Sequence, residues 1–387
     1  MKILTVLTYY RPHTSGLTIY VERMAKSLVQ RGHQVTVLTS QFDPDLPRRE
    51  VRDGVEIIRA PVLFRVSKGV IMPTFGLLAW KLVYENDIVH LHLPQFDAAG
   101  VALRGKLLGK PTVLTYHCDL QLPQGIFNRF VNGVVLLMNN LAGILADRIS
   151  AYTEDFASHS PFLKRYQEKV EMILPPVELP EASADEIEAF AADHNPQDKS
   201  PVIGMATRFA TEKGVEILLD ALPEIMESHP DTLVLYAGQY QQVMGEEAYF
   251  DRLSPRIEEY RTRGQWKFLG VLDPSQMAAF YPNLDVLVVP SLNSTETFGL
   301  VQIEAMINGT PTVASNLPGV RQPPQMTGMG EVAEIGDPAS LAQGVKKILA
   351  HPQRYKGDPS RIERQFDPLT NAAAYEDLYS RLLEERE

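Results

Sequence analysis

The sequence predicts an α/β protein made of two Rossmann-like domains with parallel sheets, which face each other across a cleft. Its 387 residues exceed the usual size of one domain, and at roughly 150 residues per domain two domains are the natural expectation. Short β-branched runs alternate with amphipathic helical stretches along the chain, a pattern typical of parallel sheets covered by helices. The alternation stops once, over residues 175–201, where five prolines and many acidic residues indicate a linker.

The first half begins with a candidate strand at Lys2–Thr8, which tyrosines, an arginine and a proline follow at once. This start therefore does not have the pattern of a secretory signal peptide. Two long helices are expected at Leu17–Arg31 and Ile126–Ala146. The other candidate strands of this half are Gln34–Ser40, Val55–Ala60, Asp87–Leu93, Pro111–His117, Arg148–Thr153 and Val170–Pro175.

The second half repeats the alternation after a linker that could carry one exposed helix. An amphipathic helix near Pro368–Glu387 ends the chain and could pack back on either domain, including the first. We therefore expect domains at 1–177 and 178–364, followed by a C-terminal helix at 365–387. The candidate strands of the second half are Pro201–Thr207, Thr232–Ala237, Trp266–Gly270, Asp285–Ser291 and Thr310–Ser315.

The composition is that of an ordinary enzyme, with 44% hydrophobic and 22% charged residues, which excludes disordered, collagenous and fibrous classes. Cys118 is the only cysteine and cannot form an internal disulfide, which fits a reducing compartment. No apolar run approaches the roughly 20 residues of a membrane-spanning helix. We expect a cytoplasmic protein, and we keep open a peripheral contact with the inner face of the membrane.

The net charge of −11 is distributed unevenly. Residues 1–177 hold 20 lysines and arginines against 15 aspartates and glutamates, whereas residues 178–364 hold 15 against 27. An acidic second half argues against nucleic acid as a partner, because binding to phosphate backbones needs a concentrated basic surface. The mildly basic first half leaves an anionic partner or a membrane surface open.

The most informative segment is PSLNSTETFGLVQIEAMINGTPTVAS, at 290–315. A buried strand leads into a loop, and we expect a helix to begin near Thr297, so that Glu296 and Glu304 are about 80° apart around one helical axis and point into the same crevice. Backbone N–H groups at the helix start, those of Phe298, Gly299 and Leu300, would hold an anion. The carboxylates would accept hydrogen bonds from sugar or ribose hydroxyls. An arbitrary pair of glutamates at this spacing would merely stabilise the first turns of a surface helix.

This segment resembles the E-x7-E signature of the family-4 retaining glycosyltransferases with the GT-B fold, and the resemblance extends over essentially the whole chain. It implies that Glu296 contacts hydroxyls of the donor sugar and that Glu304 contacts the ribose. In GMATRFATEKGVEILLDAL, at 204–222, it implies that Arg208 and Lys213 clamp the donor diphosphate. A guanidinium and an ammonium can also neutralise a departing diphosphate on physical grounds, without a metal.

Two segments of the first half support the same resemblance. YYRPHTSGLTIY, at 9–20, is similar to the family's glycine loop, with Ser15 where the first glycine is common and Gly16 kept as a donor-binding residue. LTYHCDL, at 114–120, ends a strand with His117, which the family places against the donor sugar. The resemblance makes the first domain the acceptor-binding domain and the second the nucleotide-sugar-binding domain.

Motifs for other kinds of site are weaker in this sequence. Asp43-Pro44-Asp45 spells D-x-D but lies in a proline-rich charged loop, so we expect solvated carboxylates and no metal site. No P-loop motif is present. We expect no cofactor beyond a nucleoside diphosphate sugar as co-substrate. A nucleotide-sugar 2-epimerase and a non-catalytic nucleotide-sugar-binding subunit stay open as alternatives.

The sequence thus predicts a metal-independent retaining hexosyltransferase that uses a UDP- or GDP-sugar and a sugar or lipid-linked acceptor, as in glycolipid or polysaccharide synthesis. Two apolar and basic stretches, at 63–81 and 125–148, could contact a bilayer. Arg65, Lys68, Lys81 and Arg129 would then lie near anionic headgroups.

Overall fold

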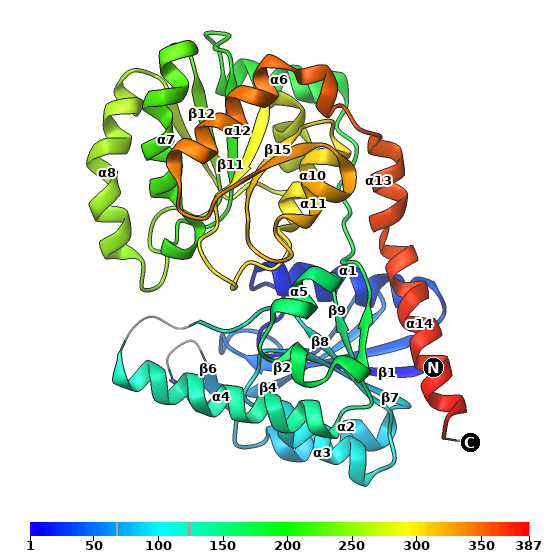
Figure 1. The fold of residues 1–387 in the computed structure, drawn as a ribbon. Coiled ribbons are helices and arrows are strands. Elements are labelled where there is room, and N and C mark those ends of the chain that lie inside the picture. Colours follow the sequence, from blue (N-terminus) through cyan, green and yellow to red (C-terminus); the bar gives the residue numbers. More distant parts are fainter. Residues whose placement is uncertain (67–68, 122–124, 387) are drawn as a thin grey trace. The chain divides into compact units, whose positions relative to one another are not determined.

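The computed structural model describes residues 1–66, 69–121 and 125–386, and the chain divides into two compact α/β units (Figure 1). Unit 1 comprises 1–176 and 366–387, and unit 2 comprises 177–365. The first unit ends one residue before the boundary expected from the sequence. The two α/β domains with parallel sheets that the alternation predicts are confirmed.

The sheet of unit 1 has the strand order β10-β9-β8-β7-β1-β2-β4-β3. Every neighbouring pair is parallel except β3 and β4. Strands that follow β1 in the chain thus extend the sheet to one side first and to the other side afterwards, so the order reverses between β1 and β7. The strands are β1 (Lys2–Val6), β2 (Gln34–Gln41), β3 (Arg49–Arg52), β4 (Val55–Pro61), β7 (Ile88–Leu93), β8 (Thr112–Tyr116), β9 (Arg148–Ala151) and β10 (Val170–Met172).

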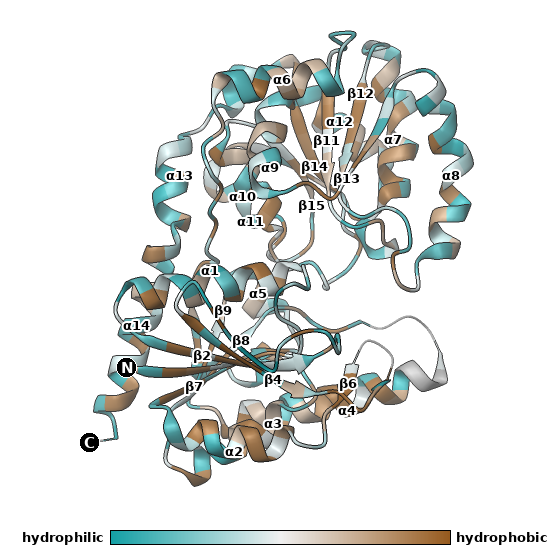
Figure 2. Ribbon diagram, turned by 180° about the vertical axis from the view of Figure 1, so that it is seen from behind, coloured by the Kyte–Doolittle hydropathy of each residue, from teal (hydrophilic) through white to brown (hydrophobic). Residues whose placement is uncertain are grey.

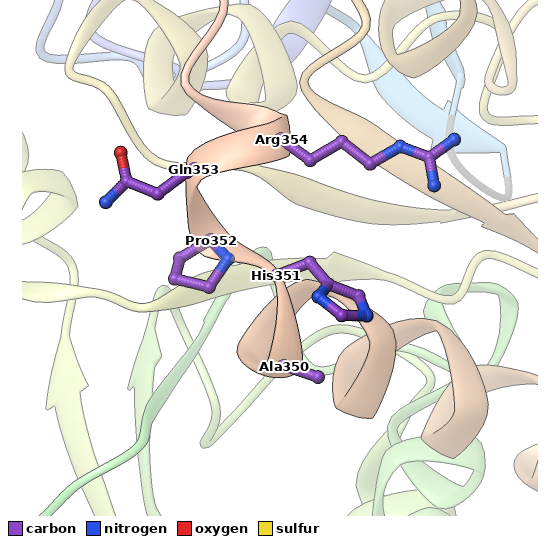
Figure 3. Close-up of a pocket in the computed structure, with 5 residues that line it drawn as sticks. All are labelled: Ala350, His351, Pro352, Gln353 and Arg354. Carbon is purple, nitrogen blue, oxygen red and sulfur yellow. The ribbon is translucent and has the colours of Figure 1, made fainter.

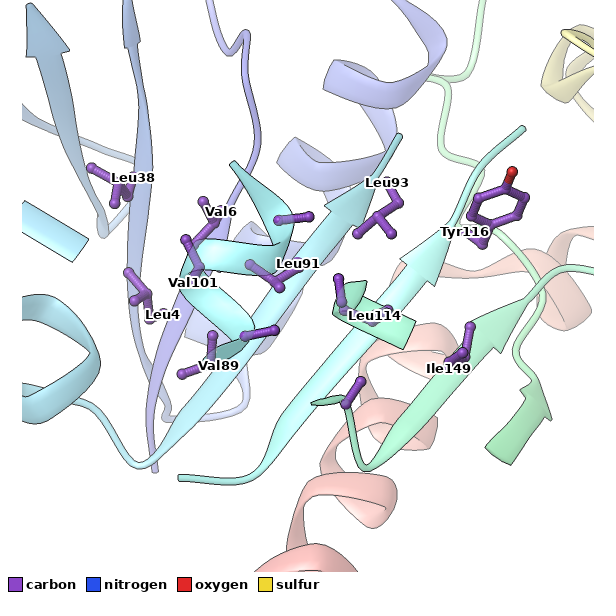
Figure 4. Close-up of a cluster of buried hydrophobic side chains, with 14 of the residues drawn as sticks. Leu4, Val6, Leu38, Val89, Leu91, Leu93, Val101, Leu114, Tyr116 and Ile149 are labelled. Atoms are coloured by element: carbon purple, nitrogen blue, oxygen red, sulfur yellow. The ribbon is translucent and has the colours of Figure 1, made fainter. Parts of the chain in front are cut away.

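Helices α2, α3 and α4 cover one face of this sheet. Figure 4 shows the apolar side chains that they enclose, including Leu4, Leu91 and Leu114 from the strands and Val101 from α3. Alternate residues of each strand point to opposite faces, so the other face carries a second set of side chains, on which α1 packs. The helices of this unit are α1 (Gly16–Gln30), α2 (Phe75–Glu85), α3 (Ala98–Leu107), α4 (Ile126–Leu145) and α5 (Glu154–His159).

Three short strands of unit 1 are absent from the sequence-based expectation. β3 is an exposed antiparallel edge strand, and β5 (Phe64–Val66) and β6 (Gly69–Ile71) form a separate two-stranded sheet. None of the three contains the buried apolar run by which the other strands were found, because an edge strand or a small hairpin buries little surface.

The sheet of unit 2 has the order β13-β12-β11-β14-β15-β16, with all neighbouring pairs parallel. This is the doubly wound order 3-2-1-4-5-6, in which the chain reverses direction across the sheet between its first and fourth strands. That point lies between β11 and β14. The strands are β11 (Val202–Ala206), β12 (Leu233–Ala237), β13 (Trp266–Gly270), β14 (Val286–Val289), β15 (Thr312–Ser315) and β16 (Gly330–Ala333).

Helices cover both faces of this second sheet. α7, α8 and α12 pack on one face, and α6, α9 and α10 pack on the other. The linker expected at 175–201 contains α6, whose first turn is fixed by a capping box between Ser183 and Glu186. The helices are α6 (Ala184–His194), α7 (Val215–Ser228), α8 (Glu247–Thr262), α9 (Pro274–Phe280), α10 (Leu300–Ile307), α11 (Gln322–Thr327) and α12 (Pro338–Ala350), with α13 (Pro359–Phe366) leading back to unit 1.

The last helix, α14 (Pro368–Glu384), belongs to unit 1 and packs against α1. Tyr375 is fully buried, and its hydroxyl lies 2.7 Å from that of Tyr20 on α1. The final segment of the chain therefore completes the core of the unit that is synthesised first.

Candidate functional site

The predicted diphosphate-binding residues of unit 2 follow β11, and the glutamate loop follows β14. These two strands are neighbours in the sheet, and the strand order reverses between them. In doubly wound folds this is the position, at the carboxyl ends of the strands, where ligands bind. Here the Nζ atom of Lys213 donates to Oε2 of Glu296 at 2.6 Å. The fold thus brings together two predicted site residues that are 83 positions apart in the chain.

A glycine next to Lys213 allows this approach. Gly214 has φ of 68°, and a Cβ atom placed on it would lie 2.1 Å from the carbonyl oxygen of Pro290, at the end of β14. The N–H of Leu292 also donates to the carbonyl of Glu212 at 2.9 Å. The loop after β11 is therefore joined to the loop after β14 by direct backbone contact, for which only glycine leaves room.

Arg208 lies on the same loop and is partly exposed. Its guanidinium is paired with Glu212, four residues later, and 43% of its side-chain surface is exposed. The following residue, Phe209, is buried and its N–H donates to the carbonyl of Gln239 at 2.7 Å. Gly238 permits this contact, because a Cβ there would lie 2.0 Å from the carbonyl of Thr207. The backbone that carries Arg208 is therefore firmly held while its side chain reaches solvent.

The helix of the glutamate motif begins later than the sequence predicts. α10 starts at Leu300, because Gly299 has φ of 76° and cannot belong to a right-handed helix. Phe298 is buried in the core, at 1% exposure. Gly299 and Leu300 therefore form the helix start, and Glu296 lies in the preceding loop.

Glu304 lies within α10 and is 7% exposed. The hydroxyl of Tyr281 donates to its Oε2 atom at 2.8 Å. The angle of about 80° predicted between the two glutamates does not hold, because it extends the helical period back to Glu296 and α10 begins only at Leu300. The two carboxylates thus have different surroundings, one beside a lysine and the other beside a buried tyrosine.

In unit 1, Gly16 is the first residue of α1 and is exposed. Ser15, which replaces the glycine common in the family, is the N-cap, and its side chain accepts from the N–H of Thr18 at 3.2 Å. A Cβ on Gly16 would meet no atom within 4 Å, so the fold itself does not demand glycine there.

His117 follows β8 directly and is buried. Its Nδ1 atom is hydrogen-bonded to the Tyr152 hydroxyl, and its Nε2 atom lies 3.0 Å from Nδ1 of His92. Burial lowers the pKa of His117 to about 3, so the imidazole is neutral at pH 7. The ring is therefore held by protein partners on both sides.

Two family models match this chain and together cover most of it. The model for the glycosyl transferase 4-like domain matches residues 15–176, and the model for glycosyl transferases group 1 matches residues 186–361.

The chain belongs to the group 1 glycosyltransferases. The resemblance of its glutamate motif to the family-4 enzymes of the GT-B fold is thereby confirmed.

Relatives of this glycosyltransferase match it over nearly their full lengths. A phosphatidyl-myo-inositol mannosyltransferase of Mycobacterium leprae is 26% identical, with 95% of this chain and 93% of the relative covered. A 2-deoxystreptamine glucosyltransferase of Streptomyces kanamyceticus is 28% identical, with coverage of 87% and 90%.

Solved structures of the GT-B fold superpose on this glycosyltransferase. The sucrose-phosphate synthase of Thermosynechococcus elongatus gives a TM-score of 0.78 at 22% identity, with 99% of both chains covered. HepE of Anabaena, solved in complex with UDP-glucose, gives a TM-score of 0.77 at 19% identity, with 98% of this chain and 100% of that chain covered.

The glycosyltransferase also contains a buried polar network that the sequence did not predict. His90 of β7 bonds through Nε2 to the Thr115 hydroxyl and through Nδ1 to the Tyr379 hydroxyl, both at 2.7 Å. The ring of His90 packs against that of His92, with centroids 4.3 Å apart and planes tilted by 34°. Two sequence patterns could have indicated this network. His90 and His92 are two residues apart in one strand, so they share a face, and Tyr375 and Tyr379 are one helical turn apart.

Two features lie apart from the predicted site residues. Within the described ranges, no group of three or more His, Cys, Asp or Glu side chains is arranged to hold a metal ion, and Asp43 caps the N–H of Asp45 at 3.0 Å. A surface hollow of about 520 Å³ follows α12 (Figure 3), and none of the predicted site residues lines it. Its lining residues are Ala350, His351, Pro352, Gln353 and Arg354.

Proposed function

We propose that this glycosyltransferase moves a hexose from a UDP- or GDP-sugar to an acceptor hydroxyl, with retention of the anomeric configuration. The observation that carries the proposal is the contact between Lys213 and Glu296 at the point of unit 2 where the strand order reverses. The relatives named for mannosyl and glucosyl transfer support a hexose, and the UDP-glucose complex of HepE supports a nucleotide-linked donor.

The chemistry follows from the charges at that point. A lysine ammonium has three hydrogen-bond donors and an arginine guanidinium has five. Lys213 and Arg208 each pair with one carboxylate, so both keep donors that can bind diphosphate oxygens. As the bond to the anomeric carbon breaks, the diphosphate gains negative charge, which these cations and the start of α10 stabilise. Leu300 and Gly299 supply that start.

The remaining residues have roles on the donor. Glu296 would bind sugar hydroxyls and Glu304 the ribose, and the family resemblance adds Gly16 and His117 as residues that contact the donor. Holding donor and acceptor together can lower the barrier by about 7–11 kcal/mol in ideal cases. No step in this scheme needs a metal ion.

Kinetics with a donor panel tests the proposal. We expect slow hydrolysis or transfer with one member of a UDP-, GDP- and ADP-sugar panel, undiminished by a chelator. Lys213→Gln and Arg208→Gln should each lower kcat by roughly 10²-fold or more, as for loss of an electrostatic stabiliser. Lys199→Gln, which alters a lysine bonded to the carbonyl of Arg263, is the matched control.

Other outcomes identify the alternatives. Epimerisation of the donor without transfer would indicate a 2-epimerase, and binding without turnover would indicate a nucleotide-sugar-binding subunit. Activity that is abolished by a chelator and restored by manganese would contradict metal-independent catalysis and return attention to Asp43 and Asp45.

We further propose that the first unit of this glycosyltransferase contacts a lipid surface. No helix in the described ranges is long and apolar enough to cross a bilayer. Nevertheless, α2, α3 and α4 lie side by side, with exposed apolar residues on each (Figure 2). These residues are Leu77, Trp80, Tyr84, Leu103, Leu107, Phe130, Leu137, Leu141 and Ile144. The three helices carry four cations and one acid, which favours an anionic bilayer. Lys68 lies outside the described residues.

A further inference from the structure

A second cluster of side chains lies at the carboxyl edge of the unit 1 sheet, away from His117. Tyr9 and His13 follow β1, Phe42 follows β2, and Arg65 lies on the short strand β5, which follows β4. Strands β1, β2 and β4 are consecutive neighbours in the sheet. Because parallel strands end at the same edge, their loops meet there, next to the position where the strand order reverses.

Three aromatic rings of this cluster touch one another. Tyr9 stacks on His13 with centroids 4.9 Å apart and planes 23° apart. Phe42 meets both rings edge-on, at 5.8 Å from Tyr9 and 5.9 Å from His13. Each of the three residues is only partly buried. The rings therefore present aromatic surface to solvent, of the kind on which the apolar face of a sugar ring packs.

An arginine adjoins the rings. Nη2 of Arg65 donates to the carbonyl oxygen of Phe42 at 2.7 Å, and its charge acts on the Tyr9 hydroxyl. The residue is exposed, and no carboxylate of the described chain forms an ion pair with it. Four of the five guanidinium N–H donors are thus left for an anionic group.

A buried arginine fixes the loops that carry the rings. Arg59 on β4 is 2% exposed. Its Nη2 atom donates to the carbonyl of Arg11 and its Nη1 atom to the carbonyl of Pro47, each at 2.9 Å, and Glu50 pairs with it at 2.5 Å. The loop after β1 is therefore bonded to the loop after β2, so that the ring cluster is held in place before any ligand binds.

One buried polar atom of the cluster lacks a partner. Nδ1 of His13 is enclosed, and no hydrogen bond to it exists among the described residues. Burial lowers the pKa of His13, so its ring is neutral at pH 7 and offers a donor or an acceptor but no charge. A buried polar group without a partner carries a free-energy cost, which the fold bears at this cluster.

We propose that Tyr9, His13, Phe42 and Arg65 form the acceptor site, which takes a sugar or cyclitol ring bearing a phosphate group. The inference rests on the proposed function, because it assigns the acceptor of that reaction. The ring packs on the aromatic cluster and the phosphate pairs with Arg65. The phosphorylated ring is either a water-soluble sugar phosphate or the headgroup of a phospholipid.

Calorimetry without a donor tests the site directly. The probes are glucose, glucose 6-phosphate, mannose, mannose 6-phosphate, inorganic phosphate, and phosphatidylcholine vesicles with or without phosphatidylinositol. We expect a phosphorylated ring, free or in vesicles, to bind about tenfold or more tightly than its unphosphorylated counterpart or inorganic phosphate. Binding of the free sugar phosphate identifies the soluble source, and binding only to phosphatidylinositol vesicles identifies the headgroup.

Variants test whether these residues cause the preference for a phosphorylated ring. Arg65→Gln should abolish the preference for the phosphorylated ring, whereas Arg49→Gln, at an exposed arginine paired with Glu56, should retain it. Phe42→Leu should weaken binding of the sugar ring with and without phosphate. An unchanged preference in Arg65→Gln, or no binding of any ring probe to the wild type, overturns the site.

Hydrolysis of the nucleotide sugar by the same preparations separates this proposal from the proposed function. Arg49→Gln should hydrolyse the donor at the wild-type rate when no acceptor is present. If the wild type hydrolyses donor but binds no ring probe, the acceptor site is wrong and the transferase function stands. If ring probes bind and no nucleotide sugar is hydrolysed or bound, the proposed function fails instead.

Discussion

At the scale of single residues, the two glutamates of the motif differ in their hydrogen-bond partners. Glu296 accepts from Lys213, whereas Glu304 is largely buried and accepts from Tyr281. A carboxylate that accepts from a lysine restrains that cation, and a buried carboxylate that accepts from a tyrosine has a fixed position. Their removal should therefore affect different parts of the donor.

We expect Glu304→Gln to weaken binding of the nucleoside diphosphate by about 1.5–3 kcal/mol, as for loss of a charged acceptor. Glu296→Gln should spare the nucleoside diphosphate, because Lys213 keeps its charge, and should weaken binding of the intact donor. Calorimetry with both ligands measures this, and Tyr281→Phe serves as the control for a shifted Glu304. Equal losses of nucleoside diphosphate affinity in the two variants would contradict the assigned roles.

Gly214 provides a second residue-scale prediction. Alanine there combines a positive φ with a Cβ 2.1 Å from the Pro290 carbonyl oxygen. We expect Gly214→Ala to destabilise unit 2 by about 1–3 kcal/mol and to weaken nucleoside diphosphate binding through displacement of Lys213. Denaturation followed by fluorescence of Trp266 in a Trp80→Phe background checks the stability.

The matched control for this substitution is Gly245→Ala. Gly245 has φ of 79°, but a Cβ there would meet no atom within 4 Å. Gly245→Ala therefore introduces the backbone strain of a positive φ but no steric clash of the new Cβ atom. If the two alanine variants lose equal stability and bind nucleoside diphosphate equally, the contact with Pro290 does not position Lys213.

At the scale of elements, α14 joins the sheet through polar groups rather than apolar ones alone. Tyr379 bonds to His90, and Tyr375 bonds to Ser150 at 2.7 Å and to Thr115 at 2.8 Å. Burial lowers the pKa of His90 to about 3, as it does for His117. This packing of α14 on the sheet therefore requires neutral histidines.

The histidines predict a loss of stability in acid. In the unfolded chain a histidine binds a proton below about pH 6.5, whereas folded His90 and His117 do so only near pH 3. The unfolded state thus binds more protons between these values, so the free energy of unfolding falls as the pH falls. Each group contributes up to about 1.4 kcal/mol per pH unit in that window.

Denaturation of unit 1 at pH 7 and pH 5 measures this dependence, with Trp80 as the fluorescent probe in a Trp266→Phe background. His90→Gln should lose less stability than the wild type between the two pH values. His351→Gln, at an exposed histidine of unit 2, should behave as the wild type. An unaltered pH dependence in His90→Gln would show that this histidine is not the titrating group.

At the scale of the whole molecule, charge and exposed apolar surface are both unevenly distributed. Residues 1–177 are net basic and residues 178–364 net acidic. The exposed apolar residues of α2, α3 and α4 lie on the basic part, on the sheet face opposite α1. A lipid surface of negative charge would therefore attract one unit of the protein and repel the other.

We expect sedimentation with anionic vesicles, and weaker sedimentation with neutral ones. The double variant Leu77→Ser, Trp80→Ser should lower the partition coefficient about tenfold or more, because each fully buried apolar side chain is worth about 1.5–3 kcal/mol. The control is Leu369→Ser on α14, because Leu369 is 43% exposed, close to the 46% of Trp80, and lies on a different helix. Equal sedimentation of all three proteins would remove α2 as the lipid contact.

The sequence determined the architecture, because the buried parallel strands are nearly continuous apolar runs and the helices between them are amphipathic. It also supplied the glutamate motif and the Arg208 to Lys213 segment, since motifs are local in the chain. It could not supply β3, β5, β6 or β16, which bury too little surface to leave a pattern. Nor could it determine the start of α10, because the conformation of Gly299 depends on what packs around it.

Only the tertiary structure decided which distant residues meet. The contact of Lys213 with Glu296 depends on the order of strands in a sheet, and that order is not encoded in any local period. The partners of His117 depend on strand register and on Tyr152, and the burial of His90 depends on a helix almost 300 residues later. Local preferences of the chain specify elements, whereas the chemistry of a site requires side chains that only packing brings within hydrogen-bonding distance.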